Sequence, residues 1–138
     1  MPGTRSGARP GFPWAASALT ALLTTTGTLH FVLPEAFDAL VPTALPGGPR
    51  WWTAASGVVE LAVAIAVAVP RTRGLGAAAA AALFVAVFPA NVKMAIDWSD
   101  RSLAAQLVAY GRLPLQIPLI LWALRVRRAA VQTRVSQA

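Results

Sequence analysis

The 138-residue sequence contains no cysteine and only one histidine. Without cysteine, the chain can form no disulfide, no thiolate metal site and no thiol relay. A single histidine also excludes haem ligation by two histidines of one copy. Any redox centre would therefore have to come from a bound small molecule or a partner chain, and the sequence predicts no metal site.

Charged residues are scarce as well. They make up 12% of the chain, with five acidic and 12 basic side chains, whereas 57% of the residues are hydrophobic. This composition is too apolar for an ordinary soluble domain of this length. The basic residues lie in short clusters between apolar blocks and do not cover one helix face, so the pattern excludes a nucleic-acid binder and a soluble enzyme and predicts a protein of the lipid bilayer.

Four apolar segments stand out, each close to the ~20 residues that a helix needs to cross the hydrocarbon core. They are residues 14–33, 51–69, 75–96 and 103–124. The link "RTRG" between the second and third is so short that it can only join antiparallel neighbours. The predicted fold is an all-α membrane protein, an antiparallel four-transmembrane-helix bundle. A disordered cytoplasmic N-terminus over 1–13 and a basic cytoplasmic tail over 125–138, unstructured after Arg128, complete the prediction.

The placement of arginine predicts the orientation, because basic residues near the ends of spans are retained in the cytoplasm. Three groups fall on one side of the four spans: Arg5 and Arg9, Arg71 and Arg73, and Arg125, Arg127, Arg128 and Arg134. We therefore predict a multi-pass protein of the bacterial cytoplasmic (inner) membrane with both termini in the cytoplasm. A cleaved signal peptide is the alternative for the first segment, but no small-x-small cleavage site follows its apolar run.

The link between the first two spans, "PEAFDALVPTALPGGPR", carries a helix pattern of its own. Pro34 suits a first helical turn, Glu35 favours the positive end of a helix dipole, and Pro42 stops a helix. We predict a short interfacial helix here, over the outer mouth of the bundle. An ordinary proline-rich loop is the alternative.

One carboxylate, Glu60, lies near the middle of the second span, where an unpaired charge costs at least about 3 kcal/mol. Counting about 1.5 Å per residue from the cytoplasmic ends puts Arg112 and Gln116 of the fourth span at a similar depth. These two residues are four apart, so they share a helix face and can present a guanidinium and an amide together. The sequence therefore predicts that Arg112 is the partner of Glu60.

More polar groups lie toward the outer ends of the spans, His30 in the first and Asn91 in the third. Pro89, Pro114 and Pro118 each remove an intrahelical hydrogen bond, which is tolerated at membrane depth beside a protein-lined or wet cavity. We predict an outward-facing polar pocket, closed on the cytoplasmic side by apolar residues. Its candidate ligand-binding residues are His30, Glu60, Asn91, Arg112 and Gln116.

Five motifs follow one another over residues 27–124: "GTLHFVLPEAFDALVP", "PGGPRW", "SGVVELAVAIAVAVPRTRGLG", "VFPANVKMA" and "RLPLQIPLILWAL". In this order they resemble the DoxX-like family of small four-helix bacterial membrane proteins. The resemblance implies a four-helix transmembrane bundle. By position it places recurring family features on the five candidate residues and on residues that support the pocket, namely Phe31, Pro34, Ser56, Gly57, Pro89 and Pro114.

Named members of that family are associated with membrane redox systems, including quinone-linked thiosulfate oxidation. The absence of cysteine argues against carrying any thiol chemistry over to this chain. What the resemblance implies is an accessory component of a membrane redox system, not an enzyme by itself, which binds a quinone or similar small molecule in the polar pocket or docks a redox partner protein.

Two other functions stay open. The polar residues could hold the helices in register in a structural or assembly subunit of a membrane complex, with no ligand of its own. They could also line the path of a small polar solute, although a through-path would need polar residues in the cytoplasmic half of the spans, where only the first span has them.

Overall fold

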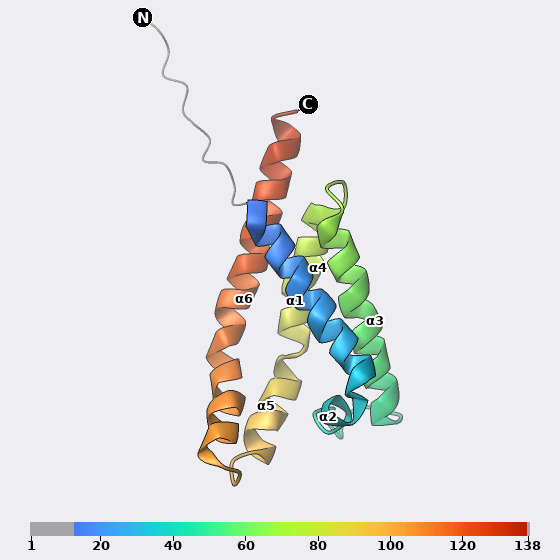
Figure 1. Cartoon of the computed structure of the whole chain (residues 1–138), viewed down its shortest axis with the longest axis vertical. Coiled ribbons are helices and arrows are strands. Elements are labelled where there is room, and N and C mark those ends of the chain that lie inside the picture. The colour runs from blue at the N-terminus through green and yellow to red at the C-terminus, as the bar shows by residue number, and fades with distance from the viewer. Residues whose placement is uncertain (1–12, 138) are drawn as a thin grey trace, which may run out of the picture.

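The structure is a computed structural model that describes residues 13–137, and within them it consists of helices and turns. Apart from Pro13, the segment predicted to be a disordered N-terminus lies outside the described residues. The helices are α1 (Pro13–Val32), α2 (Pro34–Asp38), α3 (Pro49–Ala68), α4 (Arg73–Ala86), α5 (Phe88–Asp97) and α6 (Leu103–Val135) (Figure 1).

Three helical stretches in the described part of the chain are long and apolar enough to cross a membrane, namely α3, α4 together with α5, and α6. This confirms the predicted apolar helices of a multi-pass membrane protein. Helix α1 also has 20 residues, but it is not among these three, and a run of threonines and His30 lower its hydropathy. Three of the four predicted spans are therefore confirmed as helical stretches apolar enough to cross a membrane, and the fourth, in α1, stays a prediction.

A short helix follows α1, as the sequence predicts. Helix α2 has a proline in its first turn and Glu35 beside it, where the carboxylate faces the positive end of the helix dipole. It ends at Asp38, earlier than Pro42 requires, and turns continue the link toward α3. Its position at a membrane interface stays a prediction.

The predicted span over 75–96 is broken in two at Val87. The break has a local cause, because Pro89 lacks an N–H and its ring crowds the carbonyl of the preceding turn. Helix α4 ends before it, and α5 restarts with Pro89 in its first turn, where no donor is needed.

Helix α6 is longer than predicted. It runs for 33 residues, about 50 Å, whereas the hydrocarbon core is about 30 Å thick. The prediction of an unstructured tail after Arg128 is wrong, whereas the end of the membrane span at Leu124 stays a prediction. The physical reason is that residues 125–135 are mostly alanine, arginine, valine and glutamine, with no glycine or proline to stop the helix.

The helices share one core at one end of the molecule only. There, small and aliphatic side chains of α1, α3, α4 and α6 pack together, with Leu19, Leu23 and Val67 completely buried. Toward the other end α1 and α3 remain together, while α5 packs on α6 in a separate small cluster around Met94, Ala95 and Ala109. Figure 1 shows the result as two arms, α1–α2–α3 and α5–α6, instead of a bundle closed along its whole length.

Candidate functional site

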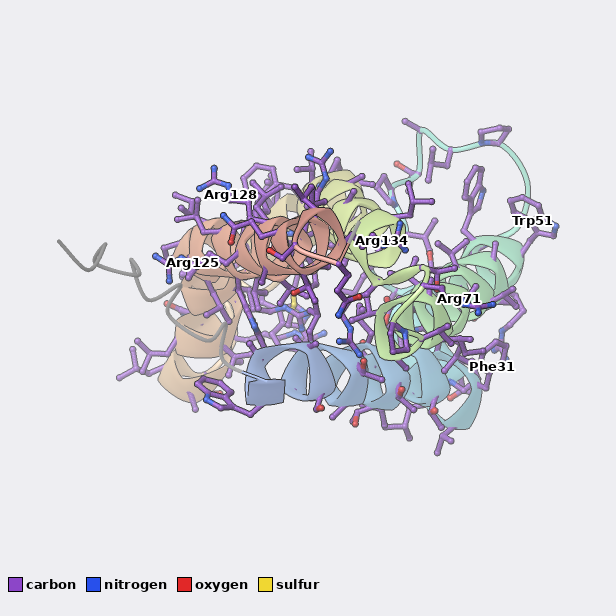
Figure 2. All side chains as sticks on the ribbon, turned by 90° about the horizontal axis from the view of Figure 1, so that it is seen from above. Phe31, Trp51, Arg71, Arg125, Arg128 and Arg134 are labelled. Carbon is purple, nitrogen blue, oxygen red and sulfur yellow. The ribbon has the colours of Figure 1, made fainter. Side chains whose placement is uncertain are left out.

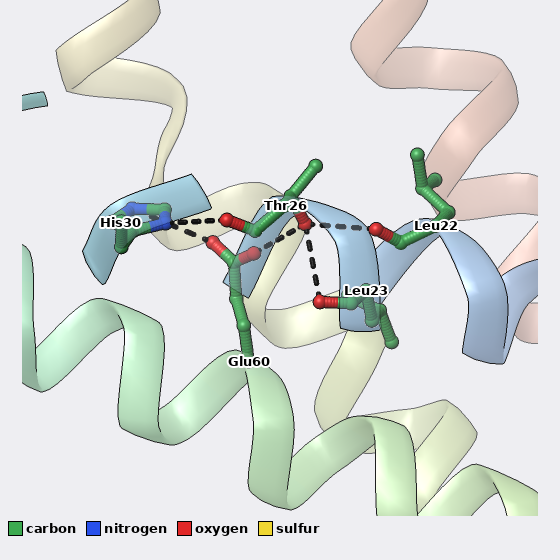
Figure 3. Close-up of polar contacts among 5 residues, drawn as sticks. All are labelled: Leu22, Leu23, Thr26, His30 and Glu60. Atoms are coloured by element: carbon green, nitrogen blue, oxygen red, sulfur yellow. Dashed lines mark hydrogen bonds and ion pairs between the residues drawn. The ribbon is translucent and has the colours of Figure 1, made fainter. Parts of the chain in front are cut away.

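Glu60 is buried on α3 and makes its contacts with α1 (Figure 3). The Thr26 hydroxyl forms a short hydrogen bond with Glu60 Oε2. On the other side, His30 Nε2 lies 3.8 Å from Glu60 Oε1, within ion-pair distance. We call these three residues the carboxyl–imidazole cluster. These partners on the neighbouring helix α1 offset the desolvation cost of burying Glu60.

The orientation of the histidine follows from its other nitrogen. His30 Nδ1 lies 2.8 Å from the carbonyl oxygen of Thr26. A carbonyl only accepts hydrogen bonds, so Nδ1 carries a hydrogen and donates it. The second nitrogen, Nε2, therefore faces Glu60 either as a neutral acceptor or as part of an imidazolium.

Thr26 has one hydroxyl hydrogen and three acceptors within reach. Besides Glu60, they are the carbonyl oxygens of Leu22 at 3.0 Å and Leu23 at 3.4 Å. If Glu60 is ionised, the hydroxyl donates to it. If Glu60 is protonated, the hydroxyl donates to Leu22 and accepts from the carboxyl group. Both protonation states of Glu60 can thus be hydrogen-bonded without moving a heavy atom.

Close packing holds the cluster together. A Cβ added to Gly57 of α3 would lie 2.6 Å from the Phe31 ring and 2.9 Å from His30 Cβ, and one added to Gly27 would lie 3.1 Å from Glu60 Cβ. The two glycines therefore let α1 and α3 approach closely on either side of Glu60. From α2, Phe37 stacks on the His30 ring with centroids 3.9 Å apart.

A second polar cluster joins α5 to α6. Asn91 Nδ2 donates to Gln116 Oε1 at 3.0 Å, and Gln116 Nε2 in turn donates to the Phe84 carbonyl oxygen in a short contact. Both amide side chains are buried. The accepting carbonyl lies in the last turn of α4, beside the break, so Gln116 supplies a donor where the helix loses its own pattern. We call Asn91 and Gln116 the amide cluster.

The predicted pairing of Glu60 with Arg112 is wrong. The Arg112 side chain is exposed, and in the described part of the chain its guanidinium makes no hydrogen bond or ion pair. The partners of Glu60 are Thr26 and His30 because α1 packs directly on α3, whereas α6 belongs to the other arm.

The candidate residues are therefore divided between two arms: His30 and Glu60 form one cluster, Asn91 and Gln116 another.

Among the supporting residues, Gly57 lies at the α1–α3 crossing, and the Phe31 ring contacts its position although the side chain is 48% exposed. Ser56 and Pro34 are half-buried, and Pro89 and Pro114 are exposed. In the described residues, no group of three or more histidine, aspartate or glutamate side chains could hold a metal ion.

Two participants escaped the sequence-based prediction. Thr26 is the nearest partner of Glu60, and Phe37 covers His30. The signal for Thr26 was present, since it precedes His30 by four residues and so shares its helix face. Phe37 could not have been found, because the position of α2 over α1 depends on the course of the turn at Leu33.

Residues 19–127 match a family described as a domain of unknown function, DUF8561. The chain belongs to this family. No curated protein matches the chain, and no solved structure does. The DUF8561 region contains both polar clusters and Arg112, and it ends before the last two turns of α6.

Proposed function

We propose that this DUF8561 member is a four-span protein of the bacterial cytoplasmic membrane with both termini in the cytoplasm. The three apolar stretches and the length of α1 support this topology. The arginines between α3 and α4 and at the end of α6 support the orientation, because such residues are retained on the cytoplasmic side. In this topology Glu60 lies near the middle of the membrane.

We further propose that the protein is an accessory component of a membrane redox system and that its carboxyl–imidazole cluster handles protons for a bound quinone. The observation that supports this function is the hydrogen bonding of Glu60, which is satisfied in both protonation states. A carboxyl group that changes state without rearrangement is suited to give and take a proton. Buried ionisable groups in membrane spans are rare and are functional candidates by default.

The residues present fit a quinone headgroup in two respects. Arg112 has an exposed guanidinium without a hydrogen-bond acceptor in the described residues, so it is available to donate to a carbonyl oxygen. Glu60, which depth counting places at a similar level in the membrane, would supply the proton. A bound quinone would supply a carrier of two electrons and two protons, with the electrons exchanged with a partner protein. The resemblance to DoxX-like proteins, some of them quinone-linked, supports the same proposal.

The test is native mass spectrometry with organic extraction of the protein purified in mild detergent from bacterial membranes. Wild type is compared with Glu60→Gln and Arg112→Gln, and Arg101→Gln serves as the control because Arg101 is exposed and stacks on Trp98. We expect wild type and control to retain a quinone, and retention to fall about tenfold or more in the other two, as for loss of a hydrogen bond to a charged group. Absence of quinone from wild type, even after it is added back, would contradict the proposal.

A structural or assembly subunit is the second candidate, and the amide cluster favours it. The bond from Gln116 to the Phe84 carbonyl ties α6 to the last turn of α4, which is a structural role. If the carboxyl–imidazole cluster were only a lock of this kind, Glu60→Gln would lower the folded yield and leave no separate defect in the surviving protein.

A further inference from the structure

The charged residues of the molecule are segregated by sign. Six arginines lie at the end where α3, α4 and the last turns of α6 meet, here called the basic end: Arg71, Arg73, Arg125, Arg127, Arg128 and Arg134. Figure 2 labels four of them, Arg71, Arg125, Arg128 and Arg134. Of the five acidic residues in the sequence, Glu60 is buried in its cluster and the other four lie in the link after α1 or near the α5–α6 turn, at the opposite end. The described part of the basic end therefore contains no acidic side chain.

The cations that lie beside these acidic residues have partners. Arg50 donates to Asp38 at 2.8 Å, Lys93 contacts Asp97 and donates to the Ala39 carbonyl, and Arg101 stacks on Trp98. Of the six arginines at the basic end, only Arg73 makes side-chain hydrogen bonds within the described residues, to the last carbonyls of α3. Five guanidinium groups are thus left to external anions.

A groove of about 470 Å³ lies beside α1 at this end. Its walls carry four hydroxyl groups and one cation, those of Ser17, Thr20, Thr24, Thr25 and Arg73. Within the described part of the chain none of these hydroxyls is hydrogen-bonded, although threonine in a helix commonly bonds the preceding turn, as Thr26 and Thr28 do here. Hydroxyl groups at membrane depth need hydrogen-bond acceptors, and a ligand with polar oxygens would supply them in this groove.

The ligand must also carry negative charge at one end. Arg73 uses Nε and Nη2 on carbonyls at 3.0 Å each, which leaves other N–H groups of its guanidinium for a phosphate. From the start of α1, Ser17 is about 6 Å and Thr25 about 18 Å into the helix, so the groove runs from headgroup level toward the hydrocarbon. Phosphate, ester carbonyls and alkyl chains follow one another along a phospholipid in the same order.

We propose that the groove at the basic end binds an anionic phospholipid. Its phosphate lies by Arg73, its ester oxygens accept hydrogen bonds from the hydroxyls of α1, and the surrounding arginines hold further anionic headgroups against the end of α6. The last turns of α6 extend past the hydrocarbon core as a helix and so keep Arg127, Arg128 and Arg134 in the headgroup layer. This proposal depends on the membrane topology proposed above and is independent of the quinone site.

The test is competition between phosphatidylglycerol and phosphatidylcholine of identical chains for delipidated protein, read by native mass spectrometry. The groove variant is Ser17→Ala/Thr24→Val, and its control is Thr28→Val, which removes a neighbouring hydroxyl outside the groove. The charge variant is Arg71→Gln/Arg127→Gln, controlled by Arg101→Gln. We expect wild type and controls to retain phosphatidylglycerol preferentially, and each arginine removed to lower that preference about fivefold.

The groove variant should lose the most tightly retained lipid while its thermal unfolding temperature stays that of wild type, because the hydroxyls removed have no partners to lose. Equal retention of both lipids by wild type, or full retention of phosphatidylglycerol by the groove variant, would overturn the proposal. Equal retention of glycerol 3-phosphate, which has no chains, would also overturn it in favour of a soluble anion. If the protein stayed in solution without detergent, the proposed membrane topology would itself be wrong.

Discussion

The two polar clusters of this protein lie on different arms and differ in their chemistry. In the amide cluster, each group is neutral, and Gln116 supplies a donor at the point where Pro89 interrupts the helix. In the carboxyl–imidazole cluster, the helices on both sides are unbroken, and the buried groups carry ionisable hydrogens. Burial alone therefore does not mark a functional residue. The amide cluster is buried because it bonds a backbone carbonyl at the end of α4, whereas no break in the backbone accounts for the buried Glu60.

The largest effect is expected where the backbone depends on a side chain. Gln116→Leu leaves the Phe84 carbonyl and the Asn91 amide buried without their partner, which should lower the free energy of unfolding by about 2 kcal/mol. Thermal unfolding in detergent, followed by tryptophan fluorescence, measures it. Asn91→Leu/Gln116→Leu should recover part of the loss, since one stranded amide is removed. A single variant as stable as wild type would show that the amide cluster repairs nothing.

Glycine substitutions compare the packing around Glu60 with that near the amide cluster. Gly57→Ala places a methyl group against Phe31 and His30 and should cost about 1–2 kcal/mol of stability, as overpacking does. Gly111→Ala on α6 meets nothing within 4 Å and should raise stability by up to about 1 kcal/mol through helix propensity. The same unfolding assay reads both. The close crossing of α1 and α3 would be contradicted if the two substitutions had the same sign.

Glu60→Gln keeps the shape of the side chain, and its amide can bond the Thr26 hydroxyl. Because the new amide can accept from the Thr26 hydroxyl and donate to a neutral Nε2 of His30, no hydrogen-bonding group is left unpaired, and we expect the free energy of unfolding to change by less than about 1 kcal/mol. Calorimetry of the purified variant beside wild type is the appropriate measurement. A loss as large as that of Gln116→Leu would move Glu60 from the functional to the structural side of the comparison.

Arg112→Gln should have the smallest effect on stability, within about 0.5 kcal/mol, because the exposed guanidinium makes no bond in the described residues. Quinone retention should fall all the same. If stability fell and retention did not, Arg112 would be a structural residue with a partner outside the described part of the chain.

Much of this architecture could be predicted from the sequence. Apolar runs of about 20 residues and proline-marked starts located the long helices and the short α2, because length and local backbone chemistry are encoded residue by residue. The break at Val87 was predicted only in part. Pro89 indicated a lost hydrogen bond, but the sequence did not show that α4 would end there. The continuation of α6 was missed because its arginines indicate where the membrane ends and not where the helix ends.

The candidate site shows where such reasoning stops. Depth counting placed Glu60, Arg112 and Gln116 at one level and paired Glu60 with Arg112, whereas the partners of Glu60 are Thr26 and His30. Residues at the same depth become neighbours only if their helices pack side by side, and the sequence does not specify which of four helices do so. The oblique course of α1 along α3 decides that Thr26 and His30 reach Glu60.

The most direct test of the central claim is the ratio of bound quinone to protein in three samples of equal purity, each with its unfolding temperature: wild type, Glu60→Gln and Asn91→Leu/Gln116→Leu. If the carboxyl–imidazole cluster is functional and the amide cluster structural, Glu60→Gln will lose the quinone at an unchanged unfolding temperature. The double variant will unfold at a lower temperature and keep the quinone in its folded fraction. Loss of stability without loss of quinone in Glu60→Gln, or the reverse pattern in the double variant, would contradict the account.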